Sequence, residues 1–253
     1  MSDHMKRLAA PRSWPLKRKV NVFIAKQTAG AHPIEDSMAA VTVLRDMIEA
    51  CDTAREAKKI IGNRELFVNG RAVKDPKAPV GFMDAISIPK MDLYYRMLIT
   101  DKGKLTLVPI SKDEAAWGLY RIQDKTLVKG GKFQLNLSGG KNILLDKNEY
   151  KCGDSLKVQY DGQKILECFP FAAGNTVLIK EGAQSGKVKT LKEVQIIRGS
   201  APNVVVFSDD TQTIVDNCFV IGADKPAITM PEASECDHVI SPWGPRDFPV
   251  GPT

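Results

Sequence analysis

The chain has 253 residues, of which 43% are hydrophobic and 26% are charged, and its formal net charge is +6. This length allows two or three small domains with a real core. Its five cysteines form no C-x-x-C pair, which argues against a zinc site and a disulfide framework and fits a reducing, intracellular compartment. No apolar run could span a bilayer and no apolar signal core is present, so we expect neither a membrane partner nor secretion.

The first 33 residues form a basic arm. They hold seven lysines and arginines and one acid, so their net charge of +6 equals the net charge of the whole chain. Pro11, Pro15 and Pro33 bias the backbone to extended conformations. We expect Trp14 to be exposed, where it can stack on a base while neighbouring cations contact phosphates. The arm is predicted to be largely disordered in the free protein and to order on a nucleic-acid partner.

Two helices are predicted next. Apolar residues at helical spacing indicate a first helix from residue 35 or 36 to residue 50. Thr53 stands three residues before Glu56, the spacing of a capping box that satisfies free N–H groups of the first helical turn. Gly62 follows the last apolar residue, so we expect it to end this second helix in a left-handed conformation.

Cations gather around the second helix. Arg55, Lys58 and Lys59 share the face opposite its apolar side. The pair Asn69-Gly70 lies between two short apolar runs and predicts a hairpin, because both residues tolerate positive φ. A lone cationic face is more often merely solvated, but the hairpin adds further cations, which favours RNA. Phosphate oxygens are the expected partners of one surface made by Arg45, Arg55, Lys58, Lys59, Arg64 and Arg71.

A resemblance appears at these residues. The run ACDTAREAKKIIGNRELFVNGRAVKDPKAPVGFMDAISIPK resembles the small S-four RNA-binding module of ribosomal proteins, pseudouridine synthases and tyrosyl-tRNA synthetases. More narrowly, TAREAKK, VNGR and PVGFMDAISIPK are similar to small-subunit ribosomal protein four of the archaeal and eukaryotic "e" type, most like the archaeal form. The segment HMKRLAAPRSWPLKRK resembles that family's amino-terminal extension, which implies that the arm lies on ribosomal RNA.

The middle of the chain is predicted to be a compact β domain, either a barrel or a sandwich. Glycine pairs and Gly-Asp or Asp-Gly steps supply the turns, and Ser111 with Glu114 predicts a short helix by the capping-box spacing. The segments GGKFQLNL and KNILL resemble the family's central domain. Strands are expected at 95–99, 105–108, 127–128, 133–137, 143–145, 156–160 and 165–169.

A further β unit follows. Strands at 177–180 and 187–190 flank a glycine-rich turn, and the whole resembles a KOW motif of a small SH3-like barrel, although a plain β barrel is about equally compatible with these residues. The turn is not a phosphate-binding P-loop, because three residues separate its glycines and Val188 stands where Ser or Thr must bind magnesium. Prolines after residue 222 predict an extended tail, either docked or disordered.

We therefore predict a multidomain α+β fold. Its parts are a basic extension (1–35), an S-four-like module of an αα-hairpin plus β structure (36–93), a central β domain (94–172), a KOW SH3-like barrel (173–222) and a proline-rich extension (223–253). The order of these parts matches the family over nearly the whole chain. It implies a structural constituent of the small ribosomal subunit, located on cytoplasmic ribosomes.

The predicted partners are small-subunit ribosomal RNA and neighbouring ribosomal proteins. The three histidines lie in the arm and the tail, so we expect no catalytic centre, and likewise no metal, cofactor or small-molecule substrate. The candidate RNA-binding residues are Lys6, Arg7, Arg12, Trp14, Lys17, Arg18, Lys19, Lys26, Arg45, Arg55, Lys58, Lys59, Arg64, Asn69, Arg71, Lys187 and Lys189.

Two other functions are compatible with these modules. An RNA-modifying enzyme of the pseudouridine-synthase type would need a catalytic aspartate in a G-R-L-D-like context, whereas Gly70-Arg71 is followed by Ala72-Val73. An assembly or transcription-elongation factor could use the KOW-like barrel, and would associate with RNA polymerase or with precursor particles only.

Overall fold

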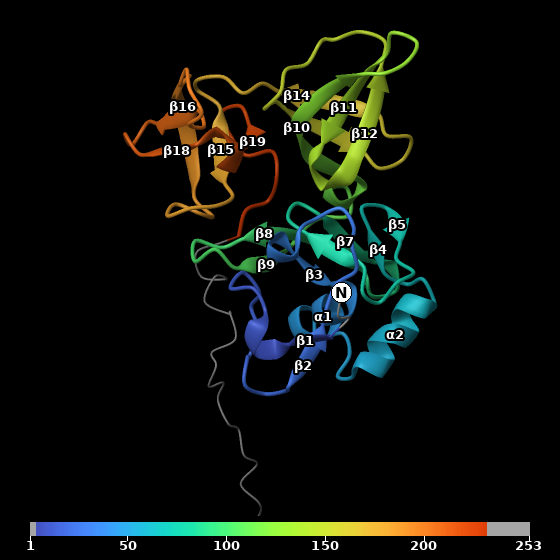
Figure 1. Cartoon of the computed structure of the whole chain (residues 1–253). Helices are drawn as coiled ribbons and strands as arrows, with labels where there is room; N and C mark the ends of the chain where they lie inside the picture. The colour runs from blue at the N-terminus through green and yellow to red at the C-terminus, as the bar shows by residue number, and fades with distance from the viewer. Residues whose placement is uncertain (1–3, 232–253) are drawn as a thin grey trace, which may run out of the picture.

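The computed structural model describes residues 4–231, and it is mostly β with few helices. Figure 1 shows two separate β units above a lower body. We call the lower body, which contains β1–β9 and both helices, the basal unit. The other two are the central sheet (β10–β14) and the C-terminal sheet (β15–β19). One main hydrophobic core takes residues from the basal unit, including its arm, from the C-terminal sheet and, with Leu119 and Phe169, from the central sheet. A smaller core lies within the central sheet. The predicted tail lies mainly outside the described residues.

The basic arm is folded, so the expectation of a disordered arm is wrong. Strand β1 (His4–Lys6) pairs antiparallel with β2 (Phe23–Ala25). The Arg18 guanidinium donates to the carbonyl oxygens of Leu8, Ala10 and Pro11 at 3.2, 2.7 and 2.8 Å. These bonds satisfy backbone groups that an isolated extended segment would leave to water.

Trp14 is buried, which corrects the expectation of an exposed stacking residue. Its exposed fraction is 2%, it belongs to the main core, and its indole Nε1 donates to the Ile34 carbonyl oxygen at 3.2 Å. An indole buries a large apolar surface once its N–H has a partner. Trp14 therefore anchors the arm to the protein and is not available to an RNA base.

The first helix is shorter than predicted. Residues expected in its first turn form β3 (Ser37–Ala39), which pairs with β6 (Pro79–Gly81). The helix starts at α1 (Ala40–Thr42) and continues as a π-helical turn over Val43–Met47. Met38, one of the apolar residues behind the helical pattern, is buried in β3 opposite Val80. A buried strand shows the same apolar residues as a buried helix, so tertiary pairing decided between them.

The sheet of the basal unit has the order β5-β4-β7-β8-β9. Strands β8 and β9, which the predicted boundaries assign to the central domain, instead extend this sheet, because Ala85 on β7 pairs with Arg96 on β8. The second helix, α2 (Ala54–Gly62), precedes the sheet in the chain. The strands are β4 (Phe67–Val68), β5 (Arg71–Ala72), β7 (Ala85–Ile88), β8 (Leu93–Ile99) and β9 (Leu105–Pro109).

The central sheet has the order β12-β11-β10-β13-β14 and is built on β10. Trp117–Leu127 form this long strand, whose first half pairs with β13 and second half with β11 across an irregularity between Ile122 and Asp124. Most of β10 was not predicted, whereas the short helix before it, Glu114–Ala116, was. The remaining strands are β11 (Phe133–Leu137), β12 (Lys141–Leu145), β13 (Ser155–Gln159) and β14 (Ile165–Phe169).

The C-terminal sheet has the order β18-β17-β16-β15-β19. The predicted strand–turn–strand is the antiparallel pair of β15 and β16. The turn between them is directed against the basal unit: a Cβ atom on Gly186 would lie 2.4 Å from the carbonyl carbon of Thr100. The strands are β15 (Thr176–Ile179), β16 (Val188–Gln195), β17 (Val204–Phe207), β18 (Gln212–Ile214) and β19 (Cys218–Gly222).

Replacing Trp14 by alanine should lower the free energy of unfolding by about 3–5 kcal/mol, because it removes a buried aromatic ring and leaves a cavity. Urea unfolding followed by circular dichroism measures this change. The matched control is Leu8→Ala, also in the arm, where the leucine is 67% exposed and the change should stay within about 0.5 kcal/mol. Equal stabilities of the two variants would contradict the packing of Trp14.

Replacing Gly186 by alanine should lower the free energy of unfolding by about 2–3 kcal/mol, because the residue has φ +78° and the new Cβ meets the Thr100 backbone. The control is Gly199→Ala, where nothing lies within 4 Å of the added atom. Differential scanning calorimetry of both variants makes the comparison. A Gly186 variant as stable as the Gly199 variant would show that the turn does not pack against the basal unit.

Candidate nucleic-acid interface

The start of α2 is fixed by the predicted capping box. The Thr53 hydroxyl accepts from the Glu56 N–H at 3.3 Å, and the Glu56 carboxylate accepts from the N–H groups of Thr53 and Asp52 at 3.2 and 3.1 Å. These hydrogen bonds, from the Thr53 backbone first, lower the pKa of Glu56. The helix therefore begins at a defined residue, which sets the direction of every side chain that follows.

The two faces of α2 differ as the sequence predicts. Ala57 and Ile61 are fully buried in the main core. Arg55, Lys58 and Lys59 are exposed on the opposite side, and within residues 4–231 none of the three takes part in an ion pair. Three uncompensated cations on one rigid helix face attract an anionic partner.

The end of α2 differs from the prediction. Gly62 is the last helical residue, and the left-handed position belongs to Arg64, with φ +59°. Arg64 donates its N–H to the Ile61 oxygen at 2.9 Å, and Glu65 donates to the Ile60 oxygen at 3.3 Å. This is the hydrogen-bond pattern of a Schellman motif, two residues later than expected. The motif leaves the Arg64 side chain exposed directly after the helix.

The predicted hairpin is confirmed. Asn69 and Gly70 both have positive φ, at 51° and 74°, and Val68 pairs with Arg71. The Asn69 side chain donates to Asp84 Oδ1 at 2.6 Å and accepts from the Ala85 N–H and the Tyr160 hydroxyl, both at 3.0 Å. Asn69 is thus held by protein partners and positions the turn.

Arg71 is the exposed cation of this hairpin. Among the described residues it has no acidic partner, and Arg64 likewise has none. Five of the six cations expected on one surface therefore remain unpaired and exposed. They are Arg55, Lys58, Lys59, Arg64 and Arg71.

Arg45, the sixth, is neutralised. Its guanidinium donates to both oxygens of Asp46, at 3.0 and 2.8 Å, and this hydrogen bonding raises the pKa of Arg45. Together with Arg7 and Lys17 of the arm, it lines a hollow of about 570 Å³. The fold thus places Arg45 and residues of the arm around one hollow, an arrangement that the sequence did not predict.

The cations of the arm divide into three groups. Arg7 is 5% exposed and donates to the Lys17 carbonyl oxygen, and Arg18 is held by the three carbonyls described above. Lys17 and Lys26 are half-buried. Lys6, Arg12 and Lys19 are exposed and remain candidates for phosphate contact.

The two lysines predicted in the C-terminal sheet also differ from each other. Lys187 is exposed. Lys189 Nζ lies 3.4 Å from an Asp209 carboxylate oxygen and donates to the Thr211 hydroxyl at 2.7 Å, and its side chain is only 9% exposed. Lys189 therefore stabilises its own sheet, and Lys187 alone can reach a partner.

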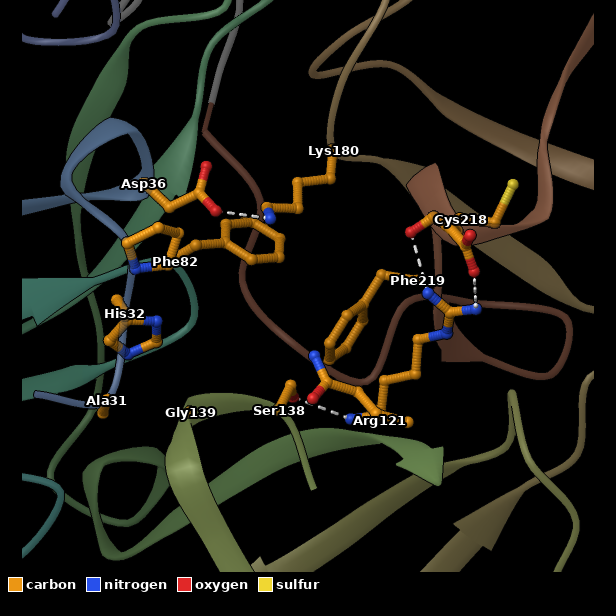
Figure 2. Close-up of a pocket in the computed structure, with 13 residues that line it drawn as sticks. Ala31, His32, Asp36, Phe82, Arg121, Ser138, Gly139, Lys180, Cys218 and Phe219 are labelled. Carbon is orange, nitrogen blue, oxygen red and sulfur yellow. Dashed lines mark hydrogen bonds and ion pairs between the residues drawn. The ribbon is translucent and has the colours of Figure 1, made fainter. Parts of the chain in front are cut away.

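A hollow of about 110 Å³ lies where the three units meet (Figure 2). Two ion pairs cross it: Lys180 to Asp36 at 2.6 Å, and Arg121 to the Asp216 carbonyl and carboxylate at 2.7 and 3.5 Å. These pairs bridge different units, so the hollow is a joint between them. Its lining holds two acids and two cations that pair with each other, so the hollow has no strong preference for an anion or a cation.

His32 lines this hollow and pairs with a buried carboxylate. Burial lowers its pKa, but the Asp84 carboxylate, 3.0 Å from Nε2, outweighs burial and the net shift is upward. The described residues contain no group of three or more metal-ligating side chains. Within them, no helix is both long and apolar enough to cross a membrane.

Lys141 is a cation whose surroundings the sequence did not reveal. Its ammonium lies 4.5 Å from the centroids of both the Tyr120 and the Tyr160 rings. Tyr120 lies within β10 and Tyr160 directly follows β13, so only the strand pairing of the central sheet brings both tyrosines to the lysine. No local sequence signal marks such a position.

Three family models match the chain. They are the RS4NT (NUC023) domain over residues 1–35, the S4 domain over residues 42–86 and ribosomal family S4e over residues 91–165. Their order along the chain follows the arm, the α2–hairpin region and the central sheet.

Curated relatives match over most of the chain. Small ribosomal subunit protein eS4 of Methanocella arvoryzae is 41% identical over 229 residues, covering 89% of this chain and 97% of the relative. That of Methanothermobacter thermautotrophicus is 39% identical over 232 residues, covering 90% and 96%. The crystal structure of 30S ribosomal protein S4e from Thermoplasma acidophilum superposes with a TM-score of 0.66 at 31% identity, covering 74% of this chain and 96% of that one. The chain therefore belongs to ribosomal family S4e.

Proposed function

We propose that this protein is a structural constituent of the small ribosomal subunit and binds ribosomal RNA through α2 and the β4–β5 hairpin. The observation that carries the proposal is the exposed and unpaired face of Arg55, Lys58 and Lys59 on a helix whose two ends are fixed by hydrogen bonds. A fixed array of cations neutralises phosphates with little loss of conformational entropy on binding.

The neighbouring cations extend this face. Arg64 follows α2 in a left-handed backbone conformation, and Arg71 is the first residue of β5, two residues after Asn69. Arginine donates to phosphate oxygens in a planar fork, which favours contact with an ordered backbone over diffuse attraction. Lys6, Arg12, Lys19 and Lys187 are further phosphate contacts in this proposal.

The remaining parts of the proposal concern organisation and partners. The C-terminal sheet acts as a KOW-type SH3-like barrel, and the domain boundaries follow the sequence prediction apart from β8 and β9. Neighbouring ribosomal proteins complete the surroundings on cytoplasmic ribosomes. The protein has no catalytic role in this proposal, because the buried His32 and Asp84 bind each other and the backbone within the fold.

The protein should sediment with mature small ribosomal subunits and stay bound in about 0.5 M salt, because many phosphate contacts act together with neighbouring proteins. Sucrose-gradient centrifugation of a lysate, with detection by mass spectrometry, provides the measurement. Recovery with RNA polymerase, or with precursor particles only, would instead support the elongation-factor or assembly-factor alternative. Isomerised uridine in ribosomal RNA incubated with the pure protein would reject the purely structural role.

Reversing Arg55, Lys58 and Lys59 to glutamate should weaken binding to transcribed small-subunit ribosomal RNA at least ~10-fold and lower the slope of log affinity against log salt by about two to three units. Filter binding at several salt concentrations measures both quantities. The matched control reverses three exposed lysines of the central sheet's loops, Lys129, Lys147 and Lys151, and should change the slope less. Equal effects of the two triple variants would argue against α2 as the main contact.

A further inference from the structure

The tip of the β4–β5 hairpin touches the central sheet. Tyr160, directly after β13, donates its hydroxyl hydrogen to Asn69 Oδ1 at 3.0 Å. Its side chain also lies against Gly70, where an added Cβ would come within 2.9 Å of the tyrosine Cβ. Arg71, the next residue, is therefore held beside a different structural unit. We call this contact region the hairpin–sheet seam: Asn69, Gly70, Arg71, Tyr120, Lys141 and Tyr160.

Lys141 brings a second cation to the seam. Its ammonium lies 4.5 Å from the ring centroids of both Tyr120 and Tyr160, so two cation–π contacts hold its position. The pKa of Lys141 is lowered to about 8, mainly because the ammonium is buried; the Asp84 carboxylate opposes this shift, and the positive charge of Arg71 adds a smaller lowering. Gly70, the residue before Arg71, packs on Tyr160, and the Lys141 ammonium contacts the ring of the same tyrosine, so this one side chain connects the two cationic residues.

Asp84 is the acid that acts on Lys141, but its carboxylate is occupied by other groups of the fold. Asp84 is 3% exposed, and its carboxylate already accepts from the Asn69 amide at 2.6 Å and from the Gly81 N–H at 2.8 Å, with His32 at 3.0 Å. Among residues 4–231, neither Arg71 nor Lys141 forms an ion pair. Two cationic residues from separate units, connected through Tyr160 and with no ion-pair partner of their own, create a place where a bound anion gains free energy from both.

We propose that Arg71 and Lys141 together bind one phosphate group of the RNA backbone at the hairpin–sheet seam. The proposal rests on the proposed function and adds the central sheet to the RNA-binding surface. A cationic surface that continues from one unit to the next favours an RNA strand over a free anion. Arg71 lies on the hairpin that follows the α2 cations in the chain, and Lys141 begins β12, the edge strand of the central sheet. In Figure 1, α2, β5 and β12 lie along the same side of the molecule.

The first test measures RNA affinity. Lys141→Gln and Arg71→Gln should each weaken binding to transcribed small-subunit ribosomal RNA about 3- to 10-fold and lower the salt slope by about one unit. Lys141→Arg should keep the slope, because it keeps the charge. Lys151→Gln, in the loop after β12, is the matched control and should change neither quantity. A Lys141→Gln variant that folds like the wild type and binds like the Lys151 control would overturn the proposal.

A second readout separates RNA contact from a structural role. Competitive acetylation followed by peptide mass spectrometry reports the reactivity and the pKa of a single lysine. In the free protein, Lys141 should have a pKa of about 8. Bound RNA should slow the acetylation of Lys141 and raise its pKa, while the reactivity of Lys151 stays unchanged. If wild-type protein binds the RNA and Lys141 reactivity does not move, the seam proposal fails and the proposed function stands. If wild-type protein does not bind the RNA at all, both fail.

Inorganic phosphate distinguishes the source of the anion. The proposal requires phosphate held within an RNA strand, so about 10 mM inorganic phosphate should protect Lys141 much less than RNA does. Equal protection by inorganic phosphate, with no slope change for Lys141→Gln, would identify a free-anion site and overturn the proposal.

Discussion

The rest of the interface depends on the hydrogen bonds and the ion pair of the buried Asp84 carboxylate. It is almost fully buried, and it binds the hairpin through Asn69, β6 through the Gly81 N–H and the end of the arm through His32. A buried charge is stable only when its surroundings supply donors and an opposite charge. Those donors come from segments far apart in the sequence, so satisfying one carboxylate also fixes the hairpin tip. The position of Arg71 at the seam follows from that constraint.

Some cations of this protein bind groups within the fold, and others stay exposed to solvent. Arg96 is fully buried, donates to the carbonyl oxygens of Glu114 and Trp117, and lies 5.0 Å from the Trp117 ring centroid, so it joins the basal unit to the start of the central sheet. Arg7, Arg18 and Lys189 likewise bind groups within the fold. The α2 face keeps its charges free. A net charge of +6 therefore says little about binding until internal cations are separated from exposed ones.

The three units are held in a fixed arrangement by contacts that do not involve RNA. Gly186 packs on the Thr100 backbone, Lys180 pairs with Asp36, and Arg121 binds Asp216. Each contact joins residues that lie in different units. A surface assembled before binding loses less conformational entropy when a large folded RNA docks on it. This organisation suits a protein whose function is to hold a permanent place in a particle.

The sequence by itself determined the local structures whose hydrogen bonds close within a few residues. The Thr53–Glu56 capping box, the Asn69-Gly70 turn and the cationic face of α2 all follow from residues next to one another. Only the tertiary structure decided the burial of Trp14, the strand conformation of Met38 and the membership of β8 and β9 in the basal sheet. It also decided which lysines and arginines stay free. The reason is physical: burial and ion pairing depend on contacts between distant segments, which no local pattern encodes.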